Sequence, residues 1–297
     1  MNKIEVTVLT PTYNRGHIIS NLYESLKKQT VMDFQWLVVD DGSDDNTQDI
    51  FSEILRQKAT FEVEYFHKEN GGKHTALNYS HDYIKGDWCI IVDSDDILTP
   101  DAVEKIISFK EKYRDREDIG VFSFLRADKQ GKPLSNNIFG DKTFISNYVD
   151  YRINKKIKGD QCEVIRTDVF KSYIFPTFKG ERFVPESWLW MHVALDGYKT
   201  LYINDAIYIG EYLTGGLTKS GRKFRINNPQ GMLADCNCYM NNRVAFFIRV
   251  KEMILIWVYG TKMGLKVRDI LKMNDMSIFV KILTLPIGKI LFYKWSK

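Results

Sequence analysis

Short apolar runs alternate with segments of helical spacing along the first half of this chain, and this alternation restricts the fold more than any other feature. The runs are rich in β-branched or aromatic residues and are bounded by Pro, Gly, Asp or Asn, which is typical of strands. Apolar residues at helical spacing occur at 18–26 and 102–109. The alternation predicts an α/β fold with a mostly parallel central sheet flanked by helices. The predicted strands are Val6–Leu9, Trp36–Val39, Val63–Phe66, Cys89–Val92 and Val121–Leu125.

A polar cluster follows each of the first four predicted strands. In open α/β sheets, ligands bind outside the carboxyl ends of the strands, so these clusters are expected to meet at one edge of the sheet. One such cluster would be weak support for a binding site, whereas a cluster after each of four strands is strong support. The clusters are Pro11–Arg15, Asp40–Ser43, Glu69–Lys73 and Asp93–Asp96.

The bulk charge of the chain argues against one class of partner and suggests another. A formal net charge of +4 over 297 residues is too small to indicate binding to nucleic acid. The charge is unevenly distributed, because the segment from Arg243 to the end holds eleven Lys or Arg against three Asp or Glu. A basic tail on a mildly acidic body favours contact with an anionic surface such as a membrane.

Cysteine usage and apolar runs favour an intracellular setting. The four cysteines, which include Cys89 and Cys162, have neither zinc-ligand nor redox spacing, as expected in a reducing compartment. The chain enters a strand pattern without a signal peptide, and no stretch reaches the roughly 18 uninterrupted apolar residues of a spanning helix. We therefore expect a cytoplasmic protein that can sit peripherally on the inner face of the plasma membrane.

The sequence Asp93-Ser94-Asp95 ends the fourth predicted strand. Carboxylates at alternate positions of a tight loop can converge on a hard cation, which accepts phosphate oxygens to complete its shell. Such a cation would neutralise charge on a departing nucleoside diphosphate. The alternative is a solvated acidic loop before a helix that begins near Thr99-Pro100-Asp101.

Two further loops carry polar residues suited to a nucleotide. Asp40 and Asp41 can accept hydrogen bonds from a base or a ribose, although the same loop also suits simple helix capping. Asn70-Gly71-Gly72-Lys73 allows close approach of the backbone to a ligand and places a cation near a helix start. The chain lacks both the P-loop and the Gly-x-Gly-x-x-Gly pattern, which disfavours nucleotide hydrolases and dehydrogenases.

Taken together, these motifs resemble glycosyltransferase family 2. The resemblance covers residues 4–125 and rests on Pro11–Arg15, Val39–Ser43, Asn70-Gly71-Gly72 with Asn78, and Asp93–Asp96 with Pro100-Asp101. It implies a GT-A, Rossmann-like fold and an inverting sugar transfer from a nucleotide-diphosphate donor, with UDP the preferred nucleotide.

The resemblance also implies roles for individual residues. Tyr13 would stack on the base, Asp41 would bond the base edge, and Asp95, with Asp93, would bind Mn²⁺ or Mg²⁺. The residues assigned to donor binding are Pro11, Thr12, Tyr13, Asn14, Arg15, Asp40, Asp41, Lys73, Asn78, Asp93 and Ser94, together with Lys219 and Arg222 from a glycine-flanked basic loop.

An inverting transfer needs a carboxylate to take the proton of the acceptor hydroxyl. The segment Phe183–Trp190 resembles the family's catalytic segment, but it has Pro-Glu where the family usually has Glu-Asp. We assign the base to Glu186, with Glu181 in reserve. The alternative role of Glu186 is support of the first helical turn.

The rest of the chain is expected to form an acceptor-binding, catalytic half and a helical extension. The expected segments are 1–126, 127–240 and 241–297, with a helix from Asn241 to Tyr259. In the tail, Met276, Phe279 and Leu283 share a helical face interrupted by lysines, which is typical of a segment lying in a membrane interface. The same pattern equally suits packing on the protein's own domain or on a second subunit.

The resulting hypothesis is a metal-dependent glycosyltransferase acting on a glycan or lipid-linked acceptor in cell-surface polysaccharide synthesis. Two alternatives remain at this point: a non-catalytic nucleotide-sugar-binding regulatory relative and a sugar nucleotidyltransferase. The second would release pyrophosphate and normally has a Gly-rich basic loop where Pro11–Gly16 stands.

Overall fold

The computed structural model describes residues 3–135, 143–210 and 221–296. Contacts divide the chain into two compact units, each assembled from three stretches of sequence. The first unit comprises Met1–Asn147, Ile157–Ile174 and Gly197–Glu211, and the second comprises Tyr148–Lys156, Phe175–Asp196 and Tyr212–Lys297. The unit boundaries do not coincide with the segment boundaries expected at residues 126 and 240.

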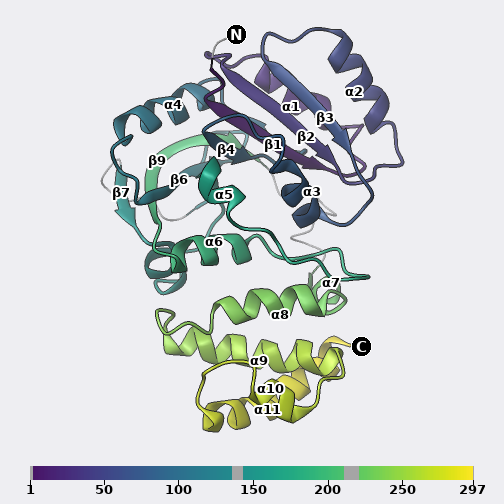
Figure 1. The fold of residues 1–297 in the computed structure, drawn as a ribbon, viewed down its shortest axis with the longest axis vertical. Helices are drawn as coiled ribbons and strands as arrows, with labels where there is room; N and C mark the ends of the chain where they lie inside the picture. Colours follow the sequence, from purple (N-terminus) through teal and green to yellow (C-terminus); the bar gives the residue numbers. More distant parts are fainter. Residues whose placement is uncertain (1–2, 136–142, 211–220, 297) are drawn as a thin grey trace. The chain divides into compact units, whose positions relative to one another are not determined.

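A nine-stranded sheet with flanking helices forms the first unit (Figure 1). Four neighbouring strands run parallel and come from the first 91 residues: β1 (Val6–Thr12), β2 (Phe34–Asp40), β3 (Glu62–His67) and β4 (Trp88–Ile91). The helices that connect or follow them are α1 (Ile19–Leu26), α2 (Thr47–Arg56), α3 (Lys73–Ser80) and α4 (Ala102–Lys112). This arrangement confirms the predicted parallel βαβ pattern.

Strands from later in the chain extend the sheet beyond this parallel half. The order is β3-β2-β1-β4-β8-β6-β9-β5, and β7 pairs with β9. Strand β8 is antiparallel to both β4 and β6, so the sheet is mixed. The later elements of this unit are β5 (Ile97–Leu98), β6 (Ile119–Ala127), β7 (Thr143–Ser146), β8 (Gln161–Arg166), α5 (Thr167–Lys171) and β9 (Lys199–Ile209).

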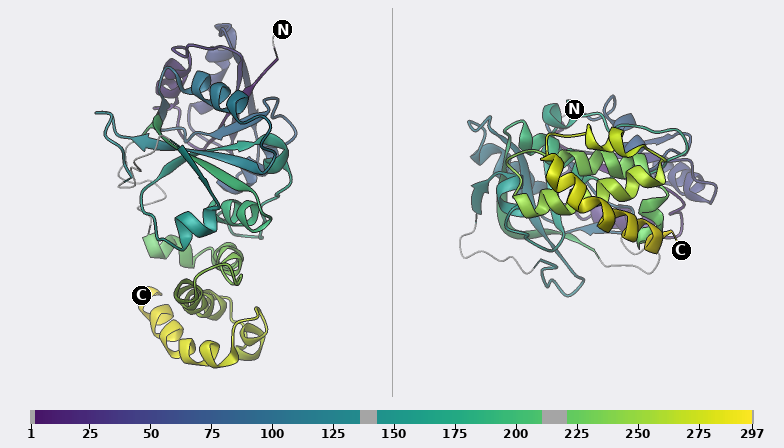
Figure 2. Two further views of the ribbon diagram at one scale, coloured as in Figure 1. Left: turned by 90° about the vertical axis from the view of Figure 1, so that its left-hand side faces the viewer. Right: turned by 90° about the horizontal axis from the view of Figure 1, so that it is seen from below.

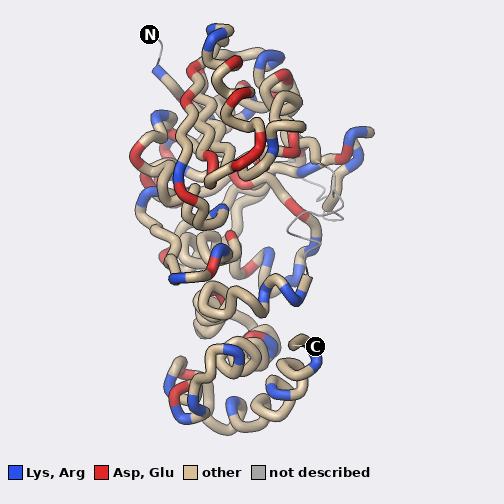
Figure 3. The backbone as a smooth tube through the Cα atoms, turned by 90° about the vertical axis from the view of Figure 1, so that its right-hand side faces the viewer, with Lys and Arg blue, Asp and Glu red and all other residues tan. Residues whose placement is uncertain are grey.

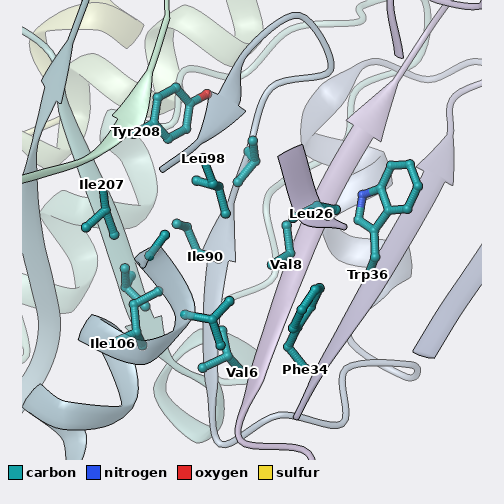
Figure 4. Packing of buried hydrophobic residues seen from close by; sticks show 14 of the residues in the cluster. Val6, Val8, Leu26, Phe34, Trp36, Ile90, Leu98, Ile106, Ile207 and Tyr208 are labelled. Atoms are coloured by element: carbon teal, nitrogen blue, oxygen red, sulfur yellow. The ribbon is translucent and has the colours of Figure 1, made fainter. Parts of the chain in front are cut away.

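Apolar side chains fill the space between the parallel strands and their helices (Figure 4). Val6 and Val8 of β1 and Trp36 of β2 are completely buried, and Leu26 of α1 packs in the same cluster. The Trp36 ring also stacks on Tyr23, with ring centroids 5.7 Å apart. This packing holds the carboxyl ends of the strands in fixed register.

Helices make up most of the second unit. A short π-helical turn, η1 (Val149–Ile153), precedes them, and Figure 2 shows α9 and α11 lying side by side, in agreement with their contacts. The helices are α6 (Ser187–Leu195), α7 (Gly221–Ile226), α8 (Pro229–Cys238), α9 (Phe246–Lys262), α10 (Val267–Leu271) and α11 (Ile278–Trp295).

The one helix whose bounds the sequence predicts in this unit differs from expectation. Helix α9 begins at Phe246 rather than at Asn241, because Asn241 to Val244 form a turn in which the Val244 amide donates to the Asn241 carbonyl. Helix α11 runs without a break through Pro286. Among the residues that the structure describes, no helix combines the length and the apolar character needed to cross a bilayer.

Candidate active site

The four predicted polar loops lie at the same edge of the parallel sheet. Thr12 of β1 pairs with Asp40 of β2, and Asp40 pairs in turn with His67 of β3. The amide of Val92, directly after β4, donates to the Leu9 carbonyl of β1 at 2.8 Å. Because these strands are parallel and in this register, their carboxyl ends are adjacent, which confirms the predicted convergence.

Asp40 is fully buried and bonded to groups of the protein itself. One carboxylate oxygen accepts hydrogen bonds from the amide and the hydroxyl of Ser43, at 2.8 and 2.6 Å. The other accepts from the Tyr65 hydroxyl at 2.5 Å and lies 3.4 Å from the His67 ring. Burial, followed by the Asp40 carboxylate, raises the pKa of Tyr65, so this phenol stays protonated. Asp40 therefore shapes the loop after β2.

Asp41 joins the loops after β2 and β3. Its carboxylate accepts hydrogen bonds from the Lys68 ammonium at 2.7 Å and from the amides of Gly71 and Gly72 at 2.9 and 2.6 Å. The Asn70 side-chain amide donates to the Asp41 carbonyl at 2.6 Å. The paired glycines, which the sequence suggested for close approach to a ligand, here direct their amides at a carboxylate of the protein.

Hydrogen bonds also connect the loop after β1 to the loop after β2. The Asn14 amide donates to the Ser43 hydroxyl at 2.8 Å, and the Asn14 side-chain oxygen accepts from the Asp44 amide at 3.0 Å. Asn14 has a positive φ of 53°, which asparagine tolerates better than most residues. The Arg15 amide donates to the Thr47 hydroxyl at 3.2 Å.

The remaining predicted donor residues of the first unit differ in exposure. The Tyr13 ring is 45% exposed, whereas Thr12 and Ser94 are buried. The Thr12 hydroxyl is buried without a hydrogen-bond partner among the described residues. Pro11 lies within β1 and Asn78 within α3. The structure thus offers an exposed aromatic ring at the start of the loop after β1.

Asp93 and Lys73 form an ion pair between the end of β4 and the start of α3, with 2.5 Å between ammonium and carboxylate. Partial burial by itself would raise the pKa of Asp93, but the positive charges of Lys73, Arg126 and Arg15 outweigh it and hold that pKa below its usual range. Asp93 is therefore ionised at neutral pH.

Asp95 lies two residues further along and pairs loosely with Arg15, whose guanidinium is 3.9 Å from the carboxylate. Both alternate carboxylates thus have a basic partner from another loop. Among the described residues, no group of three or more His, Cys, Asp and Glu side chains is arranged to hold a metal ion. A cation at Asp93 and Asp95 would need oxygen ligands from a bound molecule or from water.

Two residues that the sequence did not single out, Arg126 and Tyr208, support this carboxylate loop through Asp96. Asp96 is buried and accepts hydrogen bonds from Arg126 at 2.7 Å and from the Tyr208 hydroxyl at 2.8 Å. The Tyr208 oxygen accepts in turn from the Asp93 amide at 3.0 Å, and the Arg126 guanidinium lies over the Tyr208 ring at 4.3 Å. Burial raises the pKa of Asp96 to about 6, although Arg126 opposes the rise.

Glu186, the predicted base, lies in the second unit at the start of α6. Its carbonyl accepts hydrogen bonds from the amides of Leu189 and Trp190, at 3.0 and 3.3 Å. The next residue, Ser187, donates its hydroxyl to Asp235 of α8 at 2.7 Å. Helix α6 begins directly after Glu186, and the base role of Glu186 stays a prediction.

Glu181, the reserve candidate, has a structural role. Its carboxylate accepts hydrogen bonds from the backbone amides of Gln230 and Gly231, at 2.9 and 3.0 Å, and from the Gln230 side chain at 3.1 Å. An acidic side chain that bonds the first amides of α8 stabilises the start of that helix. This role favours Glu186 over Glu181 as the base.

The basic loop predicted to bind the donor is only partly described. Lys219 lies outside the described residues. Arg222 lies in α7, and its guanidinium is 5.4 Å from the centre of the Trp295 ring of α11. In the described structure, Arg222 therefore contacts the C-terminal helix of its own unit.

Comparison with known proteins gives a family match and a matching fold. A model described as Glycosyl transferase family 2 matches residues 7–174, more than half of the chain. The uncharacterized glycosyltransferase MG060 of Mycoplasma genitalium is 32% identical over 164 residues, which cover 53% of this chain and 50% of that protein. The match thus spans about half the length of this relative.

Two solved structures resemble the whole chain. S. aureus TarS 1–349 in complex with UDP-GlcNAc matches with a TM-score of 0.65 at 16% identity, covering 98% of this chain and 92% of that chain. The mannosyltransferase PcManGT from Pyrobaculum calidifontis, in complex with GDP-Man and Mn²⁺, matches with a TM-score of 0.60 at 15% identity, covering 100% and 83%. These likenesses confirm the predicted GT-A fold, and the family match identifies the chain as a member of glycosyl transferase family 2.

Proposed function

We propose that this protein is an inverting glycosyltransferase that moves a sugar from a UDP-sugar to an acceptor hydroxyl. The acceptor in this proposal is a glycan or a lipid-linked saccharide used in cell-surface polysaccharide synthesis, in the cytoplasm. Family membership supports sugar transfer, and the complex of TarS with UDP-GlcNAc supports a UDP-sugar as donor. The modest net charge of +4 supports a reaction without nucleic acid.

The observation that carries the donor proposal is the pairing of acids and bases at the sheet edge. Asp93 and Asp95 alternate along one loop, and each is paired with a cation, Lys73 or Arg15, from a neighbouring loop. A nucleoside diphosphate brings negative phosphates that suit these cations, and a divalent ion suits the carboxylates. The exposed ring of Tyr13 suits stacking on the base.

The carboxylate loop fits a divalent metal ion by its chemistry. Asp93 is held ionised by its basic neighbours, and ionised carboxylate oxygens are ligands that Mn²⁺ and Mg²⁺ accept. Asp95 and Asp93 would hold the ion, and diphosphate and water oxygens would complete its shell. When bound, the ion would neutralise charge on the leaving diphosphate. The Mn²⁺ complex of PcManGT supports this assignment.

Glu186 is the proposed base of the transfer. As the acceptor oxygen bonds to the anomeric carbon, its proton passes to the Glu186 carboxylate and the bond from that carbon to the diphosphate oxygen breaks. Attack from the side opposite the leaving group inverts the anomeric centre.

The donor proposal is tested by titrating the protein with a panel of nucleotide sugars, by calorimetry, with Mn²⁺ and with a chelator. We expect binding of one UDP-sugar that needs the metal and weakens at least tenfold in Asp95→Asn. Asp269→Asn, at an exposed acid of α10, is the control and should bind as the wild type does. Metal-independent binding without turnover would favour the regulatory relative, and release of pyrophosphate would favour the nucleotidyltransferase.

The base assignment is tested by Glu186→Gln, which keeps the shape of the side chain and removes its basicity. We expect kcat to fall by about 10²–10⁴-fold, with donor affinity nearly unchanged, because proton removal is lost and the donor loops are intact. Glu181→Gln is the matched control and should lower the melting temperature while kcat is retained. Unchanged turnover in Glu186→Gln would exclude this residue as the base.

A further inference from the structure

The C-terminal helix α11 has apolar residues on all of its sides. A helix of that kind is normally surrounded by other structure, because each exposed apolar face costs free energy in water. In this chain only one side of α11 is covered by described residues. The composition of its other side therefore calls for a separate explanation.

One side of α11 packs tightly against α9. Lys281, Thr284 and Gly288 are buried on this side, and the Trp257 indole N–H of α9 donates to the Lys281 carbonyl at 3.0 Å. A Cβ atom added to Gly288 would lie 2.3 Å from the Trp257 Cβ, so glycine allows the two helices to approach closely. These contacts fix the rotation of α11 about its own axis.

The opposite side forms an apolar surface, which we call the outer strip. Each member is between 47% and 66% exposed, although all are large apolar residues. They recur at the three- and four-residue spacing that places side chains on one side of a helix. The outer strip consists of Ile278, Phe279, Ile282, Leu283, Ile287, Ile290 and Tyr293.

Basic side chains accompany the outer strip. Helical periodicity places the exposed residues Lys289 and Lys294 near its two edges. From Lys262 onward, exposed basic residues also outnumber exposed acidic residues. Figure 3 shows the basic residues as blue segments that recur along this C-terminal part of the chain. Lys281 does not belong to this charged surface, because it is 3% exposed and its ammonium donates to the Leu271 carbonyl at 2.7 Å.

We propose that the outer strip of α11 inserts into the interface of an anionic membrane, with the helix lying in the membrane plane. An apolar strip bordered by lysines complements acyl chains below anionic headgroups, and the lysine stems can extend toward those headgroups. A second copy of this chain would bring the same lysines together, which opposes pairing through this surface. Since α9 covers the inner side, only the outer strip enters the lipid.

The proposal goes beyond sugar transfer and does not depend on the assignments of Glu186, Asp93 or Asp95. It is tested by sedimentation of the full chain with vesicles of phosphatidylcholine alone and of phosphatidylcholine mixed with phosphatidylglycerol. We expect binding to the mixed vesicles that weakens as salt is added. Phe279→Gln with Ile290→Gln should reduce this binding to the level of pure phosphatidylcholine. Both side chains are 66% exposed, so the fold should tolerate the change.

Two matched controls separate the outer strip from general surface effects. Leu55→Gln with Ile174→Gln removes two exposed apolar residues of the first unit and should leave vesicle binding unchanged. Lys289→Gln with Lys294→Gln should weaken binding by on the order of tenfold or more, since each lysine near an anionic surface contributes about fivefold. Lys28→Gln with Lys112→Gln removes the same charge from the first unit and should have little effect.

Three outcomes would overturn the proposal. The first is no binding to mixed vesicles by wild-type protein that is folded, as judged by a cooperative melting transition. The second is an equal loss of vesicle binding in the outer-strip variant and in its first-unit control. The third is a wild-type dimer that becomes a monomer in Phe279→Gln with Ile290→Gln and does not bind vesicles, which would assign the strip to a second copy.

Discussion

Aspartates in this chain serve different purposes according to the groups around them. Asp41 bonds two backbone amides and a lysine, and so holds one loop against another. Asp93 has a single lysine partner at the sheet edge and is 40% exposed at its side chain, which leaves it accessible to a ligand. Asp235 is buried in the helical unit and accepts from the Ser187 hydroxyl. The surroundings of each carboxylate therefore decide its role.

Asp235 should make the stability of the protein depend on pH. Burial raises the pKa of Asp235 from 3.8 to about 7, although the hydrogen bond from Ser187 opposes the rise. The folded state therefore holds this proton more tightly than the unfolded state does. Its stabilising effect is fully present below about pH 4 and is lost as pH rises through about 7, by on the order of 4 kcal/mol at most.

The variant Asp235→Asn is uncharged at every pH and still offers an oxygen to Ser187. We expect its free energy of unfolding, measured by urea denaturation at pH 5 and pH 8, to change less with pH than that of the wild type. It should also be more stable than the wild type at pH 8. Asp269→Asn, at an exposed acid, should keep the wild-type pH dependence. The prediction is contradicted if the free energy of unfolding changes equally between pH 5 and pH 8 in both variants.

Local motifs predict the residue types of the donor loops, but not the residues that support these loops from elsewhere in the chain. The loops after β1 to β4 follow one another along the chain, so their convergence follows from strand order alone. Tyr208 reaches the Asp93 amide from 115 residues away, and Arg126 reaches Asp96 from 30 residues away. No local pattern marks such partners, because their contact depends on where late strands enter the sheet.

At the scale of elements, the loop after β2 depends on the conformation of Gly42. This residue has a positive φ of 83°, and a Cβ atom there would lie 2.8 Å from the Asn70 amide nitrogen. The glycine thus lets the loop after β2 approach the loop after β3, in which Gly71 and Gly72 bind Asp41. The sequence predicts that these two loops meet at the sheet edge, but it does not show that their close approach depends on Gly42.

Gly42→Ala should destabilise the protein by about 1–3 kcal/mol, because it adds both backbone strain and a collision. Gly131→Ala is the matched control, since Gly131 has a similar φ of 78° and no atom within 4 Å of an added Cβ. We expect Gly131→Ala to show the strain alone, about 1 kcal/mol. Urea denaturation measures both values, and equal losses would mean that the approach of the two loops is not tight.

Helices of the second unit were harder to place from sequence than those of the first. The apolar pattern of α11 is visible in the sequence, but which side it buries depends on Trp257 and Gly288, which pair across α9 and α11. Proline is also a weak indicator of a helix end here, because Pro286 lies on the exposed side of α11 and the helix continues through it. Lysine spacing alone likewise gave no sign that Lys281 is buried.

For the whole molecule, the sequence suggests contiguous segments, whereas each observed unit combines separate stretches of the chain. Composition and periodicity change at points along the chain, such as residue 126, and suggest contiguous segments. The observed units instead each take three stretches, and the sheet of the first unit includes β9 from residues 199–209. No local sequence pattern indicates that a unit combines separate stretches, since this arrangement arises from pairing between strands far apart in sequence.

The strand order also has a consequence during synthesis on the ribosome. Strand β8 pairs between β4 and β6, both of which emerge from the ribosome before it does. Strand β9 emerges later still and pairs with β6, β5 and β7. At a translation rate of about 5–20 residues per second, the nascent chain exposes the edges of β4 and β6 for seconds before their partners arrive. The newborn protein is therefore most exposed to misassociation while its central strands await later ones, a period in which a chaperone would protect it best.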